Sequence, residues 1–149
     1  MSTNLEGVLF VVRRIIPSGQ GEVRHVLKNT DPEFSTEVLP FGEAYVSILF
    51  PDQKKDWKLH TQSTSRLAVL SGMIEFAMYD MRESSLTYKQ FQRITIGDDN
   101  YGLLVIPSGV AATWRNISSG KTMILNIATK PHDPNESKII PFEDIEFTW

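Results

Sequence analysis

Two side chains, His60 and Arg66, stand out as groups that could carry out acid–base chemistry in this sequence. An imidazole titrates near neutral pH and can accept or release a proton, whereas a guanidinium stays charged and can fork onto an oxyanion. The chain has three histidines and no cysteine, so thiolate metal sites, iron–sulfur clusters, disulfides and a cysteine nucleophile are excluded. A histidine or arginine on a strand can equally serve the structure alone, as a satisfied core residue or as half of an ion pair.

The stretch from His60 to the Ser71-Gly72 turn resembles, in its spacing, the first motif of the cupin family, small β-barrels that often hold a metal. The second cupin motif is matched by Pro107-Ser108-Gly109 and, at the right distance, Asn116. The family's four metal-ligand positions fall on Lys58, His60, Ser65 and Ala112. Only the histidine can bind a divalent metal, and one imidazole cannot complete a zinc, iron or manganese coordination sphere. We therefore expect no metal and no other cofactor.

A rebuilt metal site is the alternative to this metal-free barrel. It would have to recruit His25 or His132, which lie in other segments of the chain.

Within the cupins, several runs resemble the nucleotide-deoxysugar (dTDP-4-dehydrorhamnose) 3,5-epimerases, which work without a metal. The matching runs are His60-Thr61-Gln62, Arg66-Leu67, 80–87 and 106–111. Residues 19–21 match an early turn of the family more weakly. The resemblance implies an isomerase that inverts a carbon beside the ketone of a nucleotide-linked 4-keto-6-deoxy sugar.

In that reaction a base removes the acidic proton, a cation stabilises the enolate oxygen, and an acid returns a proton to the opposite face. The resemblance implies that His60 is the base and Arg66 the cation. It also implies substrate contacts from Gln62, in the same triplet as the histidine, and from Lys58.

Four further residues are expected to contact the substrate. Trp57 and Trp114, on strands predicted to line one barrel, could stack on a sugar or base, or could be plain core. His25 falls in the segment that replaces the family's nucleotide-contacting loop, and Asn126 stands where the family has its acid, a tyrosine.

Asparagine cannot donate a proton at neutral pH, so this chain needs another acid. The hydroxyls of Tyr45, Tyr79 and Tyr101 are candidates that the sequence does not rank. The chain is also shorter at its C-terminal end than most of the family, which predicts that the carboxylate orienting the family's histidine has no equivalent here.

The elements that must position these residues are short segments rich in β-branched and aromatic residues, separated by turn formers. The candidate strands are 8–14, 22–28, 44–50, 57–61, 66–71, 73–80, 89–96, 102–106, 110–116 and 121–130. This pattern predicts an all-β, cupin-type jelly-roll barrel, a double-stranded β-helix. We expect one domain over residues 1–149, with 131–149 as a C-terminal strap.

The 18 acidic and 15 basic residues are spread without a block of one sign and give a formal net charge of −3. This composition argues against nucleic acid or an anionic membrane as a partner. The short apolar run at 8–12 is neither a signal peptide nor a membrane span. We expect a cytoplasmic protein whose partner is a small molecule, a sugar nucleotide. We also expect a homodimer, because the apolar face of strand 8–14 needs a partner.

Three functions from different classes fit these features. The leading hypothesis is a metal-independent sugar-nucleotide epimerase or isomerase that abstracts a proton next to a ketone. The second is a non-catalytic carbohydrate or nucleotide-sugar binding cupin, favoured by Asn126 in place of the tyrosine. The third is a metal-free cupin lyase or cyclase of secondary metabolism, since a fold alone does not fix chemistry.

Overall fold

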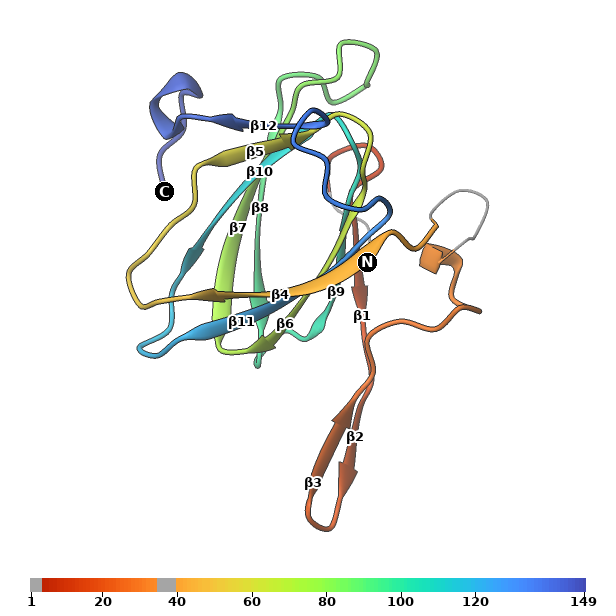
Figure 1. Ribbon diagram of the computed structural model, residues 1–149. Helices are drawn as coiled ribbons and strands as arrows, with labels where there is room; N and C mark the ends of the chain where they lie inside the picture. The colour runs from red at the N-terminus through yellow and green to blue at the C-terminus, as the bar shows by residue number, and fades with distance from the viewer. Residues whose placement is uncertain (1–3, 35–39) are drawn as a thin grey trace.

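The structure, a computed structural model, describes residues 4–34 and 40–149, which form two facing antiparallel sheets with a hairpin projecting from them (Figure 1). The first sheet has the order β1-β9-β6-β11-β4, with strands Leu9–Val12, Gly102–Ile106, Ser65–Ser71, Thr122–Ala128 and Glu43–Leu49. The second has the order β12-β5-β10-β7-β8, with strands Ser137–Ile140, Trp57–His60, Val110–Asn116, Met73–Asp80 and Phe91–Gly97. The predicted all-β, jelly-roll fold class is confirmed.

The projecting hairpin joins β2 (Ile15–Ser18) to β3 (Gly21–Arg24), and these strands pair only with each other. Helical structure in the described ranges is limited to two 3-10 turns, η1 (Pro32–Phe34) and η2 (Phe142–Asp144). Within those ranges no helix has the length and apolar character needed to cross a membrane.

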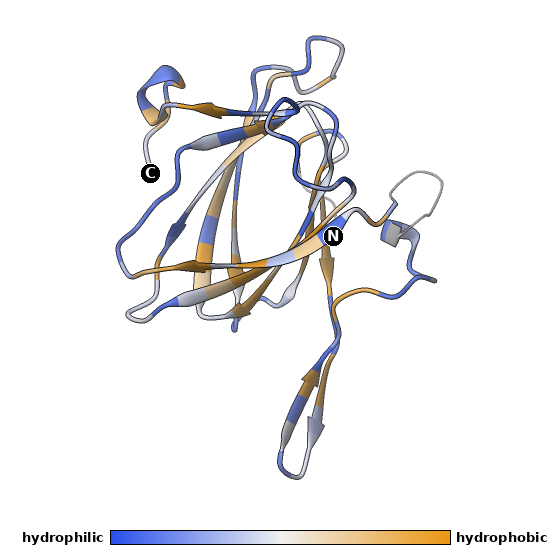
Figure 2. Ribbon diagram, in the orientation of Figure 1, coloured by the Kyte–Doolittle hydropathy of each residue, from blue (hydrophilic) through white to orange (hydrophobic). Residues whose placement is uncertain are grey.

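The core lies between the two sheets, because alternate residues of each strand point inward. Its members include Phe10, Leu67, Phe76 and Ile124, all nearly inaccessible to solvent. The orange stretches along the barrel strands in Figure 2 mark this apolar content. The inward faces therefore combine a packed core with the side chains that line the internal space.

The N-terminal segment 8–14 is shorter as a strand than expected. It contributes β1, which pairs with β9, and the chain then turns into the hairpin after Val12. Phe10 of β1 is 1% exposed, within the main core. Phe10 is thus covered inside the chain, whereas Leu9 and Val12 remain 39% and 62% exposed on this edge strand, so pairing of the strand with a second subunit stays a prediction.

The tail after Pro131 contributes a strand that the sequence pattern did not predict. β12 pairs with β5 at the edge of the second sheet. Beyond it, Phe142 stacks on Trp57 with ring centroids 6.2 Å apart, and Phe147 meets the same indole edge-on at 5.5 Å. Aromatic packing therefore fixes the tail on the outer face of that sheet.

Candidate active site

A cavity of about 440 Å³ lies between the two sheets. Its wall is largely apolar, with a small set of polar and charged side chains. The polar and charged members are Tyr45, Ser47, Lys55, Asp56, Lys58, His60, Ser65 and Asn126. A concave, mostly apolar space with a few convergent polar groups is the usual form of a small-molecule site.

The four positions matched to cupin metal ligands all line this cavity. They are Lys58, His60, Ser65 and Ala112. Ala112 of β10 lies directly opposite Lys58 of β5 in the ladder. In the described ranges no three His, Cys, Asp or Glu side chains gather where they could hold a metal ion.

Strand β5 directs Lys58 and His60 into the cavity, because residues two apart on a strand share a face. The strand is held by β10 on one side and β12 on the other. At its end, the backbone N–H of Gly109 donates to the carbonyl of His60 over 2.8 Å. Gly109 has φ +84°, and a Cβ there would meet the side chain of Arg82 at 2.4 Å, so this turn requires glycine.

The imidazole of His60 is paired with the carboxylate of Glu136. Glu136 Oε1 contacts His60 Nδ1 directly. Glu136 Oε2 accepts the backbone N–H groups of Gln62 and Ser63 at 2.9 and 3.0 Å. The carboxylate is therefore fixed from the other side and cannot turn away from the ring.

Glu136 is ionised throughout the physiological pH range. Burial alone would raise the pKa of this carboxyl group, but hydrogen bonds from His60 and from the backbone of Gln62 and Ser63 lower it to about 2. Because the ionised carboxylate accepts a hydrogen bond from Nδ1–H, the neutral ring presents Nε2 as its basic nitrogen. The expectation that the histidine lacks a carboxylate partner is wrong. Glu136 lies in the tail just before β12, a position with no local sequence signal.

Two of the expected substrate contacts, Asn126 and Trp114, line the cavity together with Lys58. Asn126 Oδ1 accepts the backbone N–H of Arg66 over 3.2 Å. Its Nδ2 donates to the hydroxyl of Tyr45 over 2.9 Å. Trp114 packs on Phe76, and its buried Nε1 has no hydrogen-bond partner among the described residues.

Arg66 does not face the cavity, which corrects the expectation that it supplies the cation. Ser65 and Leu67 on either side of it line the cavity, so strand alternation turns Arg66 to the outer face of β6. There it is 0% exposed and donates to the carbonyls of Ile127 and Pro40, both at 2.9 Å. Two cations, Lys55 and Lys58, line the cavity, and Lys58 shares the inward face of β5 with His60.

Trp57, Gln62 and His25 also lie outside the cavity lining. Trp57 points to the opposite face of β5 from Lys58 and His60, into the aromatic cluster of the tail. The Gln62 side chain is exposed and accepts a hydrogen bond from Lys130 Nζ over 2.7 Å. His25 follows the projecting hairpin, where its backbone N–H donates to the carbonyl of Arg14. The structure therefore does not bring these three to the site.

A jelly-roll barrel with a carboxylate-paired histidine in the wall of its internal cavity defines this chain as a cupin-type protein. The dTDP-4-dehydrorhamnose 3,5-epimerase family matches residues 52–149. A dTDP sugar isomerase of Desulfovibrio desulfuricans G20 is similar over 100% of this chain and 94% of its own, at 34% identity and a TM-score of 0.93. The chain therefore belongs to the dTDP-4-dehydrorhamnose 3,5-epimerase family and is an isomerase of the sugar-nucleotide epimerase class.

Two other similar proteins agree with this placement. The spore coat polysaccharide biosynthesis protein SpsL of Bacillus subtilis is 31% identical over 113 residues, which are 73% of this chain and 75% of SpsL. The dTDP-4-dehydrorhamnose 3,5-epimerase of Bacillus anthracis, solved with TDP and PPi bound, shares the fold at 17% identity. That similarity covers 100% of this chain and 88% of the B. anthracis chain, with a TM-score of 0.87. The resemblance drawn from the motifs is confirmed.

Proposed function

We propose that this chain epimerises a carbon next to the ketone of a nucleotide-linked 4-keto-6-deoxy sugar, with His60 as the general base. The observation that carries the proposal is the His60–Glu136 pair, whose imidazole lines the cavity between the sheets. A carboxylate that fixes the tautomer and the orientation of an imidazole makes the other ring nitrogen an effective proton acceptor.

The proposed first step breaks the C–H bond beside the ketone. The proton passes to Nε2 of His60, and the electron pair of the bond delocalises onto the ketone oxygen to give an enolate. Glu136 remains ionised and stabilises the imidazolium that forms. Lys58, on the same face of β5, is the proposed cation for the enolate oxygen. Return of a proton to the opposite face of the carbon restores the ketone and inverts the centre.

The proposed substrate is a thymidine diphosphate sugar. Homologues support this choice: the B. anthracis protein holds TDP and PPi, and the Legionella pneumophila protein holds dTDP-4-keto-L-rhamnose. In this chain Lys55 and Lys58 give the cavity a positive contribution suited to a diphosphate, and Trp114 offers an indole face and an N–H without a partner among the described residues. Because activated sugars of this kind are metabolites of the cell interior, we also propose a cytoplasmic location.

Solvent exchange tests this function directly. Wild-type protein in deuterium oxide should replace the proton beside the ketone with deuterium and yield an epimerised sugar. His60→Asn should stay folded, bind the sugar nucleotide and lose at least about 100-fold in exchange. If the wild-type protein binds the sugar nucleotide without proton exchange, it is a binding cupin. If it binds no sugar nucleotide, it is neither an epimerase nor a binding protein for such sugars.

We further propose a homodimer, which exposed apolar surfaces besides the edge strand β1 also support. The outer face of β4 and β11, which includes Val46, Ile48 and Met123, is apolar and 39–49% exposed. The hairpin β2–β3 stands away from the barrel and exposes Ile16 and Val23 (Figure 2). A two-stranded hairpin is only marginally stable alone, and β4 has an unpaired edge. Contact with a second copy of the chain would stabilise the hairpin and cover that edge. A monomeric mass by light scattering at micromolar concentration would contradict this.

A further inference from the structure

The Tyr45 hydroxyl is held by a hydrogen bond whose direction the structure fixes. Tyr45 of β4 and Asn126 of β11 are directly paired across the ladder. Because Asn126 Oδ1 accepts the backbone N–H of Arg66, the amide nitrogen must be the group that faces Tyr45. The phenol oxygen is therefore the acceptor in this bond, and its own proton is left to point elsewhere.

Tyr45 is also the tyrosine that lines the cavity; Tyr79, Tyr88 and Tyr101 do not. Tyr79 points outward from β7 and stacks on Phe91 with centroids 4.4 Å apart. The ring of Tyr101 lies under the guanidinium of Arg24, at the base of the projecting hairpin. The structure thus ranks the three hydroxyls that the sequence left equal.

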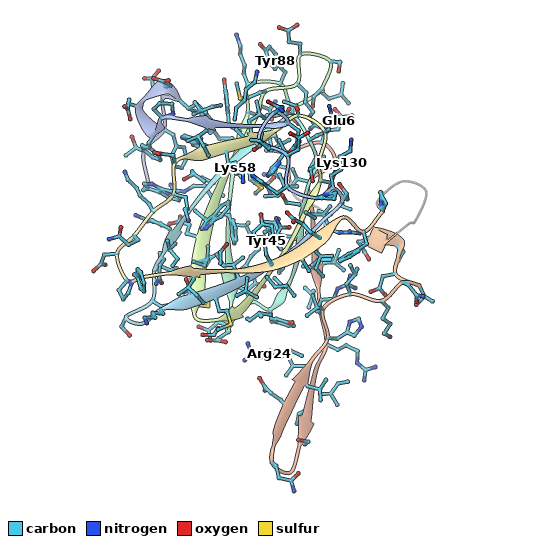
Figure 3. All side chains as sticks on the ribbon, viewed as in Figure 1. Glu6, Arg24, Tyr45, Lys58, Tyr88 and Lys130 are labelled. Carbon is cyan, nitrogen blue, oxygen red and sulfur yellow. The ribbon has the colours of Figure 1, made fainter. Side chains whose placement is uncertain are left out.

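Tyr45 and His60 belong to opposite walls. Tyr45 is on β4 of the first sheet, whereas His60 is on β5 of the second, next to Lys58, and both line the space between the sheets. Figure 3 labels Tyr45 and Lys58 on these two walls. Inversion of a carbon requires that a proton leave one face and that another arrive at the opposite face, which is the arrangement that two facing sheets provide.

We propose that Tyr45 is the general acid of the epimerisation, which rests on the proposed role of His60 as the base. The Tyr45 O–H bond breaks, its proton forms the new C–H bond on the face away from His60, and the enolate collapses to the ketone. Tyr45 is left as a phenolate that accepts the N–H of Asn126; water then takes the proton from the His60 imidazolium and returns one to Tyr45, which restores both groups. Asn126, which replaces the family's tyrosine, is then a positioning residue that orients the acid and stabilises its anion.

The test distinguishes removal of the substrate proton beside the ketone from inversion of the carbon that carried it. Tyr45→Phe keeps the base, so deuterium should still enter beside the ketone, returned on the original face. The rate of epimer formation should fall at least about 100-fold, while binding of the nucleoside diphosphate stays unchanged. Tyr79→Phe, which removes a hydroxyl from the outer surface, is the matched control and should epimerise like wild type.

Asn126→Asp provides a second variant that leaves Tyr45 in place. The oxygens of the new carboxylate can only accept, so the phenol would donate to one of them and turn its proton away from the sugar. Epimer formation should fall while exchange continues. If Tyr45→Phe epimerises at the wild-type rate, or loses exchange and inversion equally, Tyr45 is not the acid, although the base assignment stands. Absence of exchange in wild type would instead overturn the proposed function itself.

Discussion

Glu136 meets Nδ1 of His60 with one carboxylate oxygen and holds the backbone N–H groups of Gln62 and Ser63 with the other. The two backbone donors demand an oxygen at that position. The same hydrogen bonds that anchor the carboxylate therefore determine what any replacement can present to the imidazole.

Glu136→Gln should disable the base without unfolding the barrel. The backbone donors retain the amide oxygen, so the amide nitrogen faces Nδ1 and forces the ring proton onto Nε2, the wrong tautomer for proton abstraction. We expect exchange to fall at least about 100-fold, with little change in nucleotide affinity. Steady-state kinetics and calorimetric binding would check this, and unaltered exchange would show that the carboxylate does not orient the base.

The same carboxylate makes stability depend on pH in the acid range. Its pKa is about 2 in the folded chain, against an ordinary value of 4.5, so the unfolded state takes up the proton first as the pH falls. The contribution of the Glu136 carboxylate to the free energy of unfolding is complete above about pH 4.5 and is lost as the pH drops toward 2. Urea unfolding at a series of pH values should show a shallower acid slope for Glu136→Gln than for wild type.

Lys58→Met should slow exchange and epimer formation in the same proportion. The substitution keeps the length of the side chain and removes the charge next to His60, and the enolate precedes both outcomes. A loss of about 10- to 1,000-fold is expected. Lys138→Met, on the neighbouring strand β12 and outside the cavity lining, is the control. Equal rates for the two variants would remove Lys58 from the mechanism.

Arg66→Met should affect stability rather than chemistry. The guanidinium donates to backbone carbonyls on the outer side of β6, including those of Ile127 and Pro40. Leaving these buried acceptors unpaired should cost about 1 to 3 kcal/mol in the free energy of unfolding. The exchange rate per folded molecule should stay within about twofold of wild type. A loss of exchange without a loss of stability would show that Arg66 takes part in the reaction.

Purified protein should carry no stoichiometric transition metal, because three of the four ligand positions are Lys58, Ser65 and Ala112. Elemental analysis should find far less than one zinc, iron, nickel or manganese per chain, and a chelator should leave exchange intact. About one metal per chain, removable only with loss of ligand binding, would contradict this.

The turn signals and the cupin spacing were enough to predict the fold class and to identify Lys58, His60, Ser65 and Ala112, whose positions converge on the cavity. Two wrong expectations, Trp57 and Arg66, came from overlooking the alternation of side chains along a strand. Lys58 and His60 share a face, so Trp57, one residue before Lys58, had to point outward, and Arg66 likewise fell between two inward neighbours. The alternation of side chains along β5 and β6 excludes both residues from the cavity.

Glu136 could not be found in this way. It approaches His60 from a segment 76 residues away, and its position depends on how β12 meets β5. The choice among the tyrosines likewise required the ladder between β4 and β11, which pairs Tyr45 with Asn126. Both are non-local pairings, which local residue patterns do not encode.

The pairing of β12 with β5 links the completion of folding to the onset of activity. β5 finds both of its neighbours, β10 and β12, only from later parts of the chain, and non-local contacts of this kind form slowly. A chain in which β12 has not yet paired with β5 would lack the Glu136 contact that orients the imidazole of His60. After refolding, catalytic competence should consequently lag behind the recovery of sheet content, because Glu136, which orients the base, directly precedes β12 and depends on its pairing with β5.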